Sequence, residues 1–300
     1  MRTAIARATD RLAAAGVPSP RVDAIALAEH ALGVPQLIVA VPPPVPAGFE
    51  GAYETLVRRR EAREPLQHIV GYAAFRRLNV RVEPGVFVPR PETEVVAGQA
   101  AEEAVRLIAA GRTPLVVDLC TGSGVLALSV AFEAPGSRVV AVDIDPAAVA
   151  LARQNAARLR AASTEPSETP GTSTGPGGIR VEPGDVADPA LLSEFAGSVD
   201  IVSSNPPYIP DDAVPLEPEV AEHDPQRSLF GGGGDGLDVP RQVVAAAARL
   251  LRAGGLFVME HADVQGAEVR ALVDRTGAFE PATTHRDLIG RDRYVLARRR

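Results

Sequence analysis

The chain has 300 residues, 46% of them hydrophobic, and a formal net charge of -7 at pH 7. This length allows one large domain or two smaller ones. The acidic balance argues against a broad nucleic-acid-binding surface, because such surfaces are basic.

Several chemistries are excluded by residues that the chain lacks. All 31 basic residues are arginines, so a P-loop lysine, a Schiff-base lysine and a lysine nucleophile are excluded. The single cysteine, Cys120, excludes an internal disulfide and a cysteine-rich zinc site, and the histidines show no metal-binding spacing. With no long apolar run and no signal-peptide pattern, we expect a cytoplasmic protein that binds no membrane. We also expect a monomer that binds no metal and makes no direct contact with nucleic acid.

Residues 1–72 are expected to form a small helical domain, because apolar residues recur there at helical spacing. The expected helices are Thr3–Ala15, Pro20–Leu32 and Gly48–Arg63. Alternation from Phe75 to Val82 then predicts a β-hairpin, and residues 73–92 are interpreted as this hairpin and a proline-rich connector.

Residues 93–300 alternate between predicted helices and strands. Several strands are nearly continuous apolar runs, as is typical of strands covered by helices on both faces. This texture predicts an α/β fold with a doubly wound, Rossmann-like sheet. Residues 162–178, rich in Ser, Thr, Pro and Gly, are expected to be a flexible insertion. The expected strands are Leu115–Leu119, Arg138–Val142, Ile179–Val181, Asp200–Ser204, Gly255–Glu260 and Tyr294–Ala297, and the clearest helices are Pro146–Arg160 and Pro240–Arg252.

A glycine-containing loop, Asp118–Gly124, follows the first strand of this region. Glycines let the backbone approach a ligand, and the next helix offers free N–H groups. The spacing of Gly122, Gly124 and Ala127 matches the dinucleotide fingerprint, which alone is a weak signal. Asp118 disfavours a pyrophosphate by charge repulsion, so we favour a ligand with an ammonium group and no phosphate, namely S-adenosylmethionine.

Acidic residues follow the next two strands as well. Asp143 can accept hydrogen bonds from both ribose hydroxyls, while Asp185 and Val186 could frame the adenine. Each aspartate could instead be a helix cap or a solvated loop charge. For Asp145, which precedes Pro146, the helix cap is the preferred interpretation.

The tetrapeptide Asn205-Pro206-Pro207-Tyr208 follows the fourth strand and is the most specific motif in the chain. The Asn205 side-chain oxygen and the Pro206 carbonyl are two acceptors for the two N–H groups of a planar amide or aromatic amine. The prolines fix the backbone, and Tyr208 offers a flat wall. This arrangement predicts methyl transfer to a weakly nucleophilic nitrogen, although an ordinary turn after a strand is the alternative.

Taken together, these motifs resemble the HemK/PrmC family of release factor glutamine methyltransferases. Asn-Pro-Pro-Tyr is shared with adenine-N6 DNA methyltransferases, but the Pro-Arg-Pro-Glu-Thr segment at 89–93 and the helical N-terminal region narrow the choice. The resemblance covers nearly the whole chain. The segments that carry it are Glu64–Ile69, Phe87–Glu94, Asp118–Gly124, Asn205–Tyr208, Leu229–Gly236, Glu260-His261 and Gln265-Gly266.

The resemblance implies that residues 93–300 form an S-adenosylmethionine-dependent methyltransferase domain and that residues 1–72 recognise the substrate. The implied reaction is N5-methylation of the glutamine in the Gly-Gly-Gln loop of class-1 peptide chain release factors, with S-adenosylhomocysteine as product. Cys120 stands where glycine is usual, and Val186 replaces a larger side chain. By position, the family's cofactor contacts fall on Cys120, Thr121, Gly122, Ser123, Gly124, Asp143, Val186 and Asn205, and its glutamine pocket on Asn205, Pro206, Pro207 and Tyr208.

Arg90 and Glu92 are candidate substrate contacts, although Pro91 and Glu92 also fit the first turn of a helix. His68, His223, His261 and His285, together with Glu260, are interpreted as structural. Four other functions stay open: glutamine methylation of a ribosomal protein, adenine-N6 methylation of nucleic acid, NAD-dependent dehydrogenation, and an inactive cofactor-binding scaffold.

Overall fold

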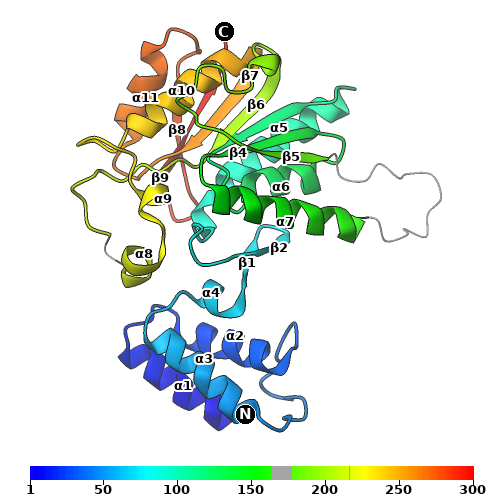
Figure 1. The fold of residues 1–300 in the computed structure, drawn as a ribbon, viewed down its shortest axis with the longest axis vertical. Coiled ribbons are helices and arrows are strands. Elements are labelled where there is room, and N and C mark those ends of the chain that lie inside the picture. Colours follow the sequence, from blue (N-terminus) through cyan, green and yellow to red (C-terminus); the bar gives the residue numbers. More distant parts are fainter. Residues whose placement is uncertain (164–177, 216) are drawn as a thin grey trace, which may run out of the picture. The chain divides into compact units, whose positions relative to one another are not determined.

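The computed structural model describes residues 1–163, 178–215 and 217–300, and these form two compact units (Figure 1). The N-terminal unit consists of Met1–Tyr72, Val82–Pro84 and Val214–Asp224. The sheet unit consists of Ala73–Arg81, Gly85–Ala213 and Pro225–Arg300. The expected insertion at 162–178 lies almost entirely outside the described residues. Among the described residues, no helix is long and apolar enough to cross a membrane.

The N-terminal unit is helical. Leu12 of α1, Leu27 of α2 and Val57 of α3 are buried in its core. Tyr53 is buried there too. Its hydroxyl donates to the Ala24 carbonyl at 2.9 Å, so this buried hydroxyl has a hydrogen-bond partner. The three predicted helices are confirmed to within two residues at each end. The helices are α1 (Arg2–Ala14), α2 (Pro20–Leu32), α3 (Phe49–Glu61), α4 (Leu66–Val70) and α8 (Pro218–His223).

Helix α8 comes from a distant part of the chain and is joined to the N-terminal unit by ion pairs. Glu219 accepts from Arg60 at 2.8 Å and from Arg63 at 2.5 Å, and Arg60 also pairs with Asp23 at 2.7 Å. Asp23, Arg60 and Glu219 are all buried. The two pairs of Glu219 join residues 159 and 156 positions apart, so no local sequence pattern could predict them.

The sheet unit contains a seven-stranded sheet with the order β5-β4-β3-β6-β7-β9-β8 (Figure 1). Strands β3 to β7 are parallel to one another, and β9 runs antiparallel between β7 and β8. The doubly wound, Rossmann-like prediction is confirmed. The strands are β3 (Leu115–Leu119), β4 (Arg138–Asp143), β5 (Ile179–Pro183), β6 (Val199–Ser204), β7 (Leu251–Glu260), β8 (Thr283–Arg286) and β9 (Asp292–Arg298).

Alternate residues of the central strands enter two separate cores, one on each face of the sheet. Val116 packs with residues of α5, α6 and α7, whereas its neighbour Val117 packs with residues of α10 and α11. This two-sided burial explains why β3 and β6 are buried at every position. The helices are α5 (Glu94–Ala109), α6 (Val125–Glu133), α7 (Pro146–Ser163), α9 (Gln226–Leu229), α10 (Asp238–Leu250) and α11 (Gly266–Arg275), with short 3-10 turns at Pro91–Thr93 and Ser193–Phe195.

The predicted hairpin is present, and it begins at Tyr72, before the expected start at Phe75. The strands are β1 (Tyr72–Phe75) and β2 (Leu78–Arg81), and the turn between them begins at Arg76. Arg76 has a φ of 50°, which a non-glycine residue rarely adopts, and Glu94 and Glu133 bind its backbone and guanidinium. These tertiary contacts, not a turn-forming residue, hold the turn, so no sequence pattern indicated its position. Strand β8 and the early start of β7 at Leu251 were also missed.

Candidate active site

The loop after β3 lies at the carboxyl edge of the parallel strands, where doubly wound sheets bind their ligands. Its backbone turns sharply, with φ of 58° at Cys120, 57° at Gly122 and 92° at Gly124. A Cβ at position 124 would lie 3.4 Å from both Ala152 and Leu128, so glycine permits the close approach of α7. Cys120 adopts a left-handed conformation, which explains why glycine suits that position.

Asp118 is fully buried beneath this loop. Its carboxyl oxygens accept from the Thr121 hydroxyl at 2.5 Å and from the Ser203 hydroxyl of β6 at 3.0 Å. Burial raises the pKa of Asp118 to about 7, although the bonds from Thr121 and Ser203 oppose the shift. Asp118 therefore anchors the loop to β6, a role that the sequence did not predict. Its contact with a ligand ammonium stays a prediction.

Asp143, at the end of β4, braces the same loop. Its two oxygens accept from the Gly122 backbone N–H at 2.8 Å and the Asp145 backbone N–H at 2.9 Å. Each oxygen keeps a further lone pair for a ribose hydroxyl, so the predicted role is compatible with these bonds but untested. Asp145 accepts from the Ala147 N–H at 2.8 Å, which confirms it as the cap of α7.

Asp185 and Val186 differ in their surroundings. Asp185 is exposed, and its side chain accepts from the Ala187 N–H at 2.9 Å, as in a local turn. Val186 is half-buried and packs against the same core as Cys120. The structure thus gives Asp185 a turn contact, and the predicted adenine contact of both residues stays a prediction.

Asn205 directly follows β6, whose register pairs Ser204 with Leu119 of β3. The end of β6 and the start of the glycine loop are therefore adjacent. The Asn205 side-chain nitrogen donates to the Thr93 hydroxyl at 3.2 Å, and Thr93 is 2% exposed. This bond leaves the Asn205 Oδ1 atom on the other side of the amide, available as an acceptor. Thr93 was not predicted, although it lies in the Pro-Arg-Pro-Glu-Thr segment that carries the family resemblance.

The rest of the tetrapeptide is supported by a glycine segment, Gly231–Gly236. A Cβ on Gly231 would lie 2.7 Å from the Pro207 carbonyl oxygen, and one on Gly236 would collide with the Tyr208 carbonyl oxygen. Gln265 donates to the Tyr208 carbonyl at 2.9 Å. In the sequence, the four consecutive glycines at 231–234 were the feature that could have indicated this close backbone packing.

Two charged residues near the tetrapeptide were not among the predicted site residues. Glu260, at the end of β7, is 1% exposed and accepts from the Tyr208 hydroxyl at 3.3 Å. This bond places Glu260 against the tetrapeptide, and its interpretation as a structural residue stays a prediction. Arg293 of β9 lies near Tyr208 and Glu260. No motif in the sequence around Arg293 indicated that it would lie there. Two of its nitrogens donate to Asp287 at 3.3 Å.

Arg90 and Glu92, the two candidate substrate contacts, have different neighbours. The Arg90 guanidinium lies 5.1 Å from the centre of the Phe87 ring. Glu92 is close enough to Glu260 and Tyr208 to raise the pKa of both groups. Pro91 begins a 3-10 turn, which confirms the helix-start interpretation of this segment without testing a substrate role.

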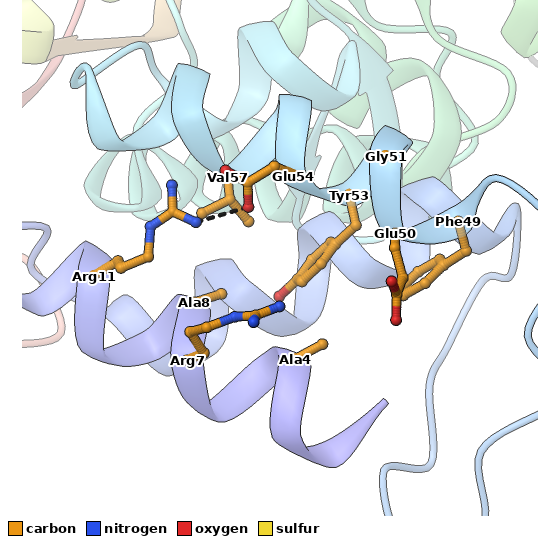
Figure 2. A pocket seen from close by; sticks show the side chains of 10 residues that line it. All are labelled: Ala4, Arg7, Ala8, Arg11, Phe49, Glu50, Gly51, Tyr53, Glu54 and Val57. Carbon is orange, nitrogen blue, oxygen red and sulfur yellow. Dashed lines mark hydrogen bonds and ion pairs between the residues drawn. The ribbon is translucent and has the colours of Figure 1, made fainter.

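The N-terminal unit contains a separate pocket of about 260 Å³ between α1 and α3 (Figure 2). Figure 2 shows Arg11 on α1 directed at Glu54 on α3, a pair that the structure places at 2.7 Å. The Phe49 and Tyr53 rings are stacked with centres 5.3 Å apart. None of the predicted site residues lines this pocket. In the described part of the chain, no group of three or more His, Cys, Asp or Glu side chains is arranged to hold a metal ion.

Known methyltransferases are similar in sequence to this chain over its whole length. A release factor glutamine methyltransferase of Mycolicibacterium smegmatis is 47% identical over 100% of this chain and 98% of its own length. The chain belongs to the release factor glutamine methyltransferase family. The family described as PrmC N-terminal domain matches residues 3–71, and the one described as ribosomal protein L11 methyltransferase (PrmA) matches residues 89–167.

Membership of the release factor glutamine methyltransferase family does not by itself fix the acceptor. A protein of Streptomyces pristinaespiralis, named 4-amino-L-phenylalanine/4-methylamino-L-phenylalanine methyltransferase, is 39% identical over 94% of this chain and 89% of its own length. Among solved structures, a 16S rRNA N2 G1207 methyltransferase of T. thermophilus aligns with a TM-score of 0.51 and 23% identity. It covers 76% of this chain and 50% of its own, and it supports the fold alone.

Proposed function

We propose that this protein transfers a methyl group from S-adenosylmethionine to the side-chain nitrogen of the glutamine in the Gly-Gly-Gln loop of class-1 release factors, leaving S-adenosylhomocysteine. The observation that carries the proposal is the orientation of the Asn205 amide. The Asn205 nitrogen donates to Thr93, so the Asn205 oxygen is available to accept a hydrogen bond from a substrate N–H beside the glycine loop. The family membership of the chain supports glutamine as the acceptor.

The residues at the glycine loop fit the cofactor. The left-handed turns at Gly122 and Gly124 bring backbone close to a ligand, and α6 begins directly after them. Asp143 is fixed by two backbone bonds with lone pairs remaining for a ribose. Thr121 and Ser123 belong to the turn and are proposed as cofactor contacts, as are Cys120 and Val186, which pack against one core of the sheet. When bound, S-adenosylmethionine would supply an activated methyl group.

The acceptor nitrogen must be oriented, because the lone pair of an amide is delocalised into its carbonyl group. We infer that Asn205 Oδ1 and the Pro206 carbonyl accept its two N–H groups, which directs the remaining face of the nitrogen at the methyl donor. Pro207 stiffens the turn, and the Tyr208 ring covers the planar group. One bond from carbon to sulfur breaks and one from carbon to nitrogen forms, after which the acidic alkylated nitrogen releases a proton to water.

A free aromatic amine is the second candidate acceptor. The observation that favours it is the 39% identical relative, whose name specifies 4-amino-L-phenylalanine. An arylamine also presents two N–H groups and a planar ring, so the same pocket geometry would suit it. The family comparison does not favour a ribosomal protein or a nucleobase.

An acceptor assay separates these candidates. The protein is incubated with labelled S-adenosylmethionine and, in parallel, a class-1 release factor, its Gln-to-Ala loop variant, ribosomal protein L11 and 4-amino-L-phenylalanine. We expect label only in the unmodified release factor. Equal label in the loop variant would contradict the proposal, and label in the free amino acid alone would establish the second candidate.

We further propose that the protein acts in the cytoplasm as a monomer, without direct contact with nucleic acid or membrane. The net charge of -7 supports the absence of nucleic-acid binding. Light scattering at working concentrations, with and without duplex DNA, checks the oligomeric state and the binding together.

A further inference from the structure

We propose that Gln265 is a positioning residue for methyl transfer, an inference that rests on the function proposed above. Its side-chain amide binds the backbone of the Asn205–Tyr208 tetrapeptide and of two other loops of the sheet unit, so it fixes the backbone that would surround the acceptor nitrogen. Gln265 directly precedes α11, at the end of the loop that follows β7.

Three hydrogen bonds use the whole amide group of Gln265. Its nitrogen donates to the Tyr208 carbonyl and to the Asp235 carbonyl, each at 2.9 Å. Its oxygen accepts from the Ala262 backbone N–H at 3.1 Å. The residue is 7% exposed, so these bonds are shielded from water. They join the tetrapeptide, the glycine segment Gly231–Gly236 and the loop after β7.

The chemistry of these three partners selects a glutamine in one orientation. An amide carries two N–H donors and one acceptor oxygen, which matches two carbonyls and one N–H. The reversed amide would face its oxygen toward two carbonyl oxygens and its NH2 group toward an N–H. The backbone of Gln265 is held as well, because its N–H donates to the Ala262 carbonyl at 2.9 Å. The side chain therefore acts from a fixed base.

The position of the Tyr208 carbonyl bears directly on the acceptor pocket. Gly236 packs so closely against this carbonyl oxygen that a Cβ at position 236 would collide with it, while Gln265 binds the same oxygen. Proline fixes φ, so Pro206 and Pro207 leave the tetrapeptide few ways to bend. A shift at Tyr208 is therefore passed to the Pro206 carbonyl, which we infer accepts a substrate N–H.

Gln265 should act on the acceptor and not on the methyl donor. Its side-chain partners, Tyr208, Asp235 and Ala262, all lie outside the glycine loop Asp118–Gly124. Loss of the amide should therefore slow methyl transfer and leave the binding of S-adenosylmethionine unchanged. A residue needed only for folding would not separate these two quantities.

A first experiment needs no acceptor molecule. The chain has four tyrosines, so labelling with carbonyl-13C tyrosine gives four resonances, of which Tyr208→Phe identifies one. A carbonyl carbon resonance moves upfield when the carbonyl loses a hydrogen bond. We expect the Tyr208 resonance to move upfield in Gln265→Met, which has neither amide donor, and the other three to stay in place. An unchanged Tyr208 resonance would overturn the proposal.

The second experiment measures methyl transfer. Because misplacing a reacting group by about 1 Å can cost about 100-fold in rate, we expect Gln265→Met to lower kcat by about that factor, with KM for S-adenosylmethionine unchanged. Gln265→Glu keeps an oxygen for the Ala262 N–H but loses both donors, so its kcat should be lowered too. Wild-type kcat in Gln265→Glu would show that the two donated bonds do not position the acceptor.

Asp274→Ala is the matched control on the same helix. Asp274 of α11 accepts from the Ala282 backbone N–H at 2.9 Å, so its loss also removes a bond that fixes a loop to α11. We expect this variant to lower the unfolding temperature and to keep the wild-type kcat. A kcat for Gln265→Met within a few-fold of this control would overturn the positioning role.

The two proposals fail in different ways. A wild-type protein that methylates 4-amino-L-phenylalanine and not the release factor contradicts the proposed function, while the carbonyl resonance and the kcat measured with that acceptor still decide the role of Gln265. An active wild type whose Gln265→Met variant keeps the same kcat contradicts the role of Gln265 and leaves the proposed function standing.

Discussion

At the scale of single residues, the account depends on the Asn205 amide. Its nitrogen is bound by Thr93, and its oxygen is the acceptor that we propose for the substrate N–H. The sequence predicted Asn205 and its role from the Asn-Pro-Pro-Tyr motif alone. It could not predict Thr93, because the bond joins residues 112 positions apart and depends on how the start of α5 packs beside β6.

Replacing Asn205 with alanine should reduce activity far more than stability. Loss of one preorganised hydrogen-bond partner in an active site typically costs about 10²- to 10³-fold in kcat. The Thr93 bond that is also lost contributes about 1 kcal/mol to the free energy of unfolding. Single-turnover rates and thermal unfolding, measured side by side, check both expectations.

Asp212→Ala is the matched control for Asn205→Ala, since Asp212 is an exposed residue of the same connection after β6. It should leave both the rate and the unfolding temperature unchanged. A rate for Asn205→Ala within a few-fold of this control would contradict the assigned role.

Asp118 should make stability depend on pH. Its folded-state pKa, about 7, lies above its ordinary value of 3.8. The stability that it contributes is therefore fully present below about pH 4 and is lost as pH rises through about 7, at about 1.4 kcal/mol for each pKa unit. Asp118→Asn removes the titration, so its free energy of unfolding should fall less steeply over this range.

The measurement is urea unfolding of wild type and Asp118→Asn at several pH values between 4 and 7.5. Glu260 contributes in the same direction, because burial raises its pKa from 4.5 to about 7, so some slope should remain in the variant. Parallel stability curves for the two proteins would show that Asp118 is not the titrating group.

At the scale of elements, the glycine loop shows which of its positions need glycine. Cys120 already carries a side chain at a φ of 58°, so a left-handed turn there tolerates a Cβ. Gly122 has a φ of 57° and no atom within 4 Å of an added Cβ. Gly124 has a φ of 92° and would meet Ala152 and Leu128 at 3.4 Å.

We therefore expect Gly124→Ala to destabilise the protein more than Gly122→Ala. The left-handed conformation costs a side chain about 1–2 kcal/mol, and contact with α7 adds to that cost only at position 124. Chemical denaturation ranks the two variants, and calorimetry with S-adenosylmethionine reports whether the loop still binds. The reverse order of stability would contradict this explanation of the loop.

Regular elements were predicted well where local pattern controls them. The apolar runs of β3 and β6 and the helical spacing of α1 to α3 locate those elements, because their burial follows directly from periodicity. The position of the hairpin turn at Arg76 was not predicted, since Glu94 and Glu133 hold it in a conformation that arginine rarely adopts. Strand β8 has only four residues and none is buried, so it gives no apolar signal.

At the scale of the whole molecule, three separate segments of the chain make up the N-terminal unit: Met1–Tyr72, Val82–Pro84 and Val214–Asp224. The helical spacing of apolar residues predicted the segment 1–72, but no sequence pattern indicated that residues 214–224 belong to the same unit. The reason is that charge pairing, not hydrophobic pattern, joins them. Burial raises the pKa of Glu219, but hydrogen bonds from Arg63 and Arg60 outweigh this effect and lower it to about 2.

Removing Glu219 should destabilise the N-terminal unit. Glu219→Ala leaves the buried Arg60 with one partner fewer, and breaking a buried pair costs about 3–5 kcal/mol. Because the pKa of Glu219 is lowered, its contribution is present above pH 4.5 and is lost as pH falls toward 2. Hydrogen exchange of α2 and α3 at neutral pH reports the effect on this unit alone.

Glu222→Ala is the control for Glu219→Ala, since Glu222 is an exposed carboxylate on the same helix, α8. It should leave exchange in α2 and α3 unchanged. Equal effects of the two substitutions would show that α8 is held by something other than the ion pairs.

The central claim, that Asn205 and its neighbours present a release factor glutamine for methylation, is tested most directly by locating the transferred methyl group. A class-1 release factor is incubated with the protein and S-adenosylmethionine, digested, and analysed by fragmentation mass spectrometry. The account predicts one methyl group, on the side-chain nitrogen of the Gly-Gly-Gln glutamine, and none with the Asn205→Ala protein. A methyl group on any other residue would contradict the account. So would a release factor glutamine that stays unmodified under conditions in which the protein fully methylates another acceptor.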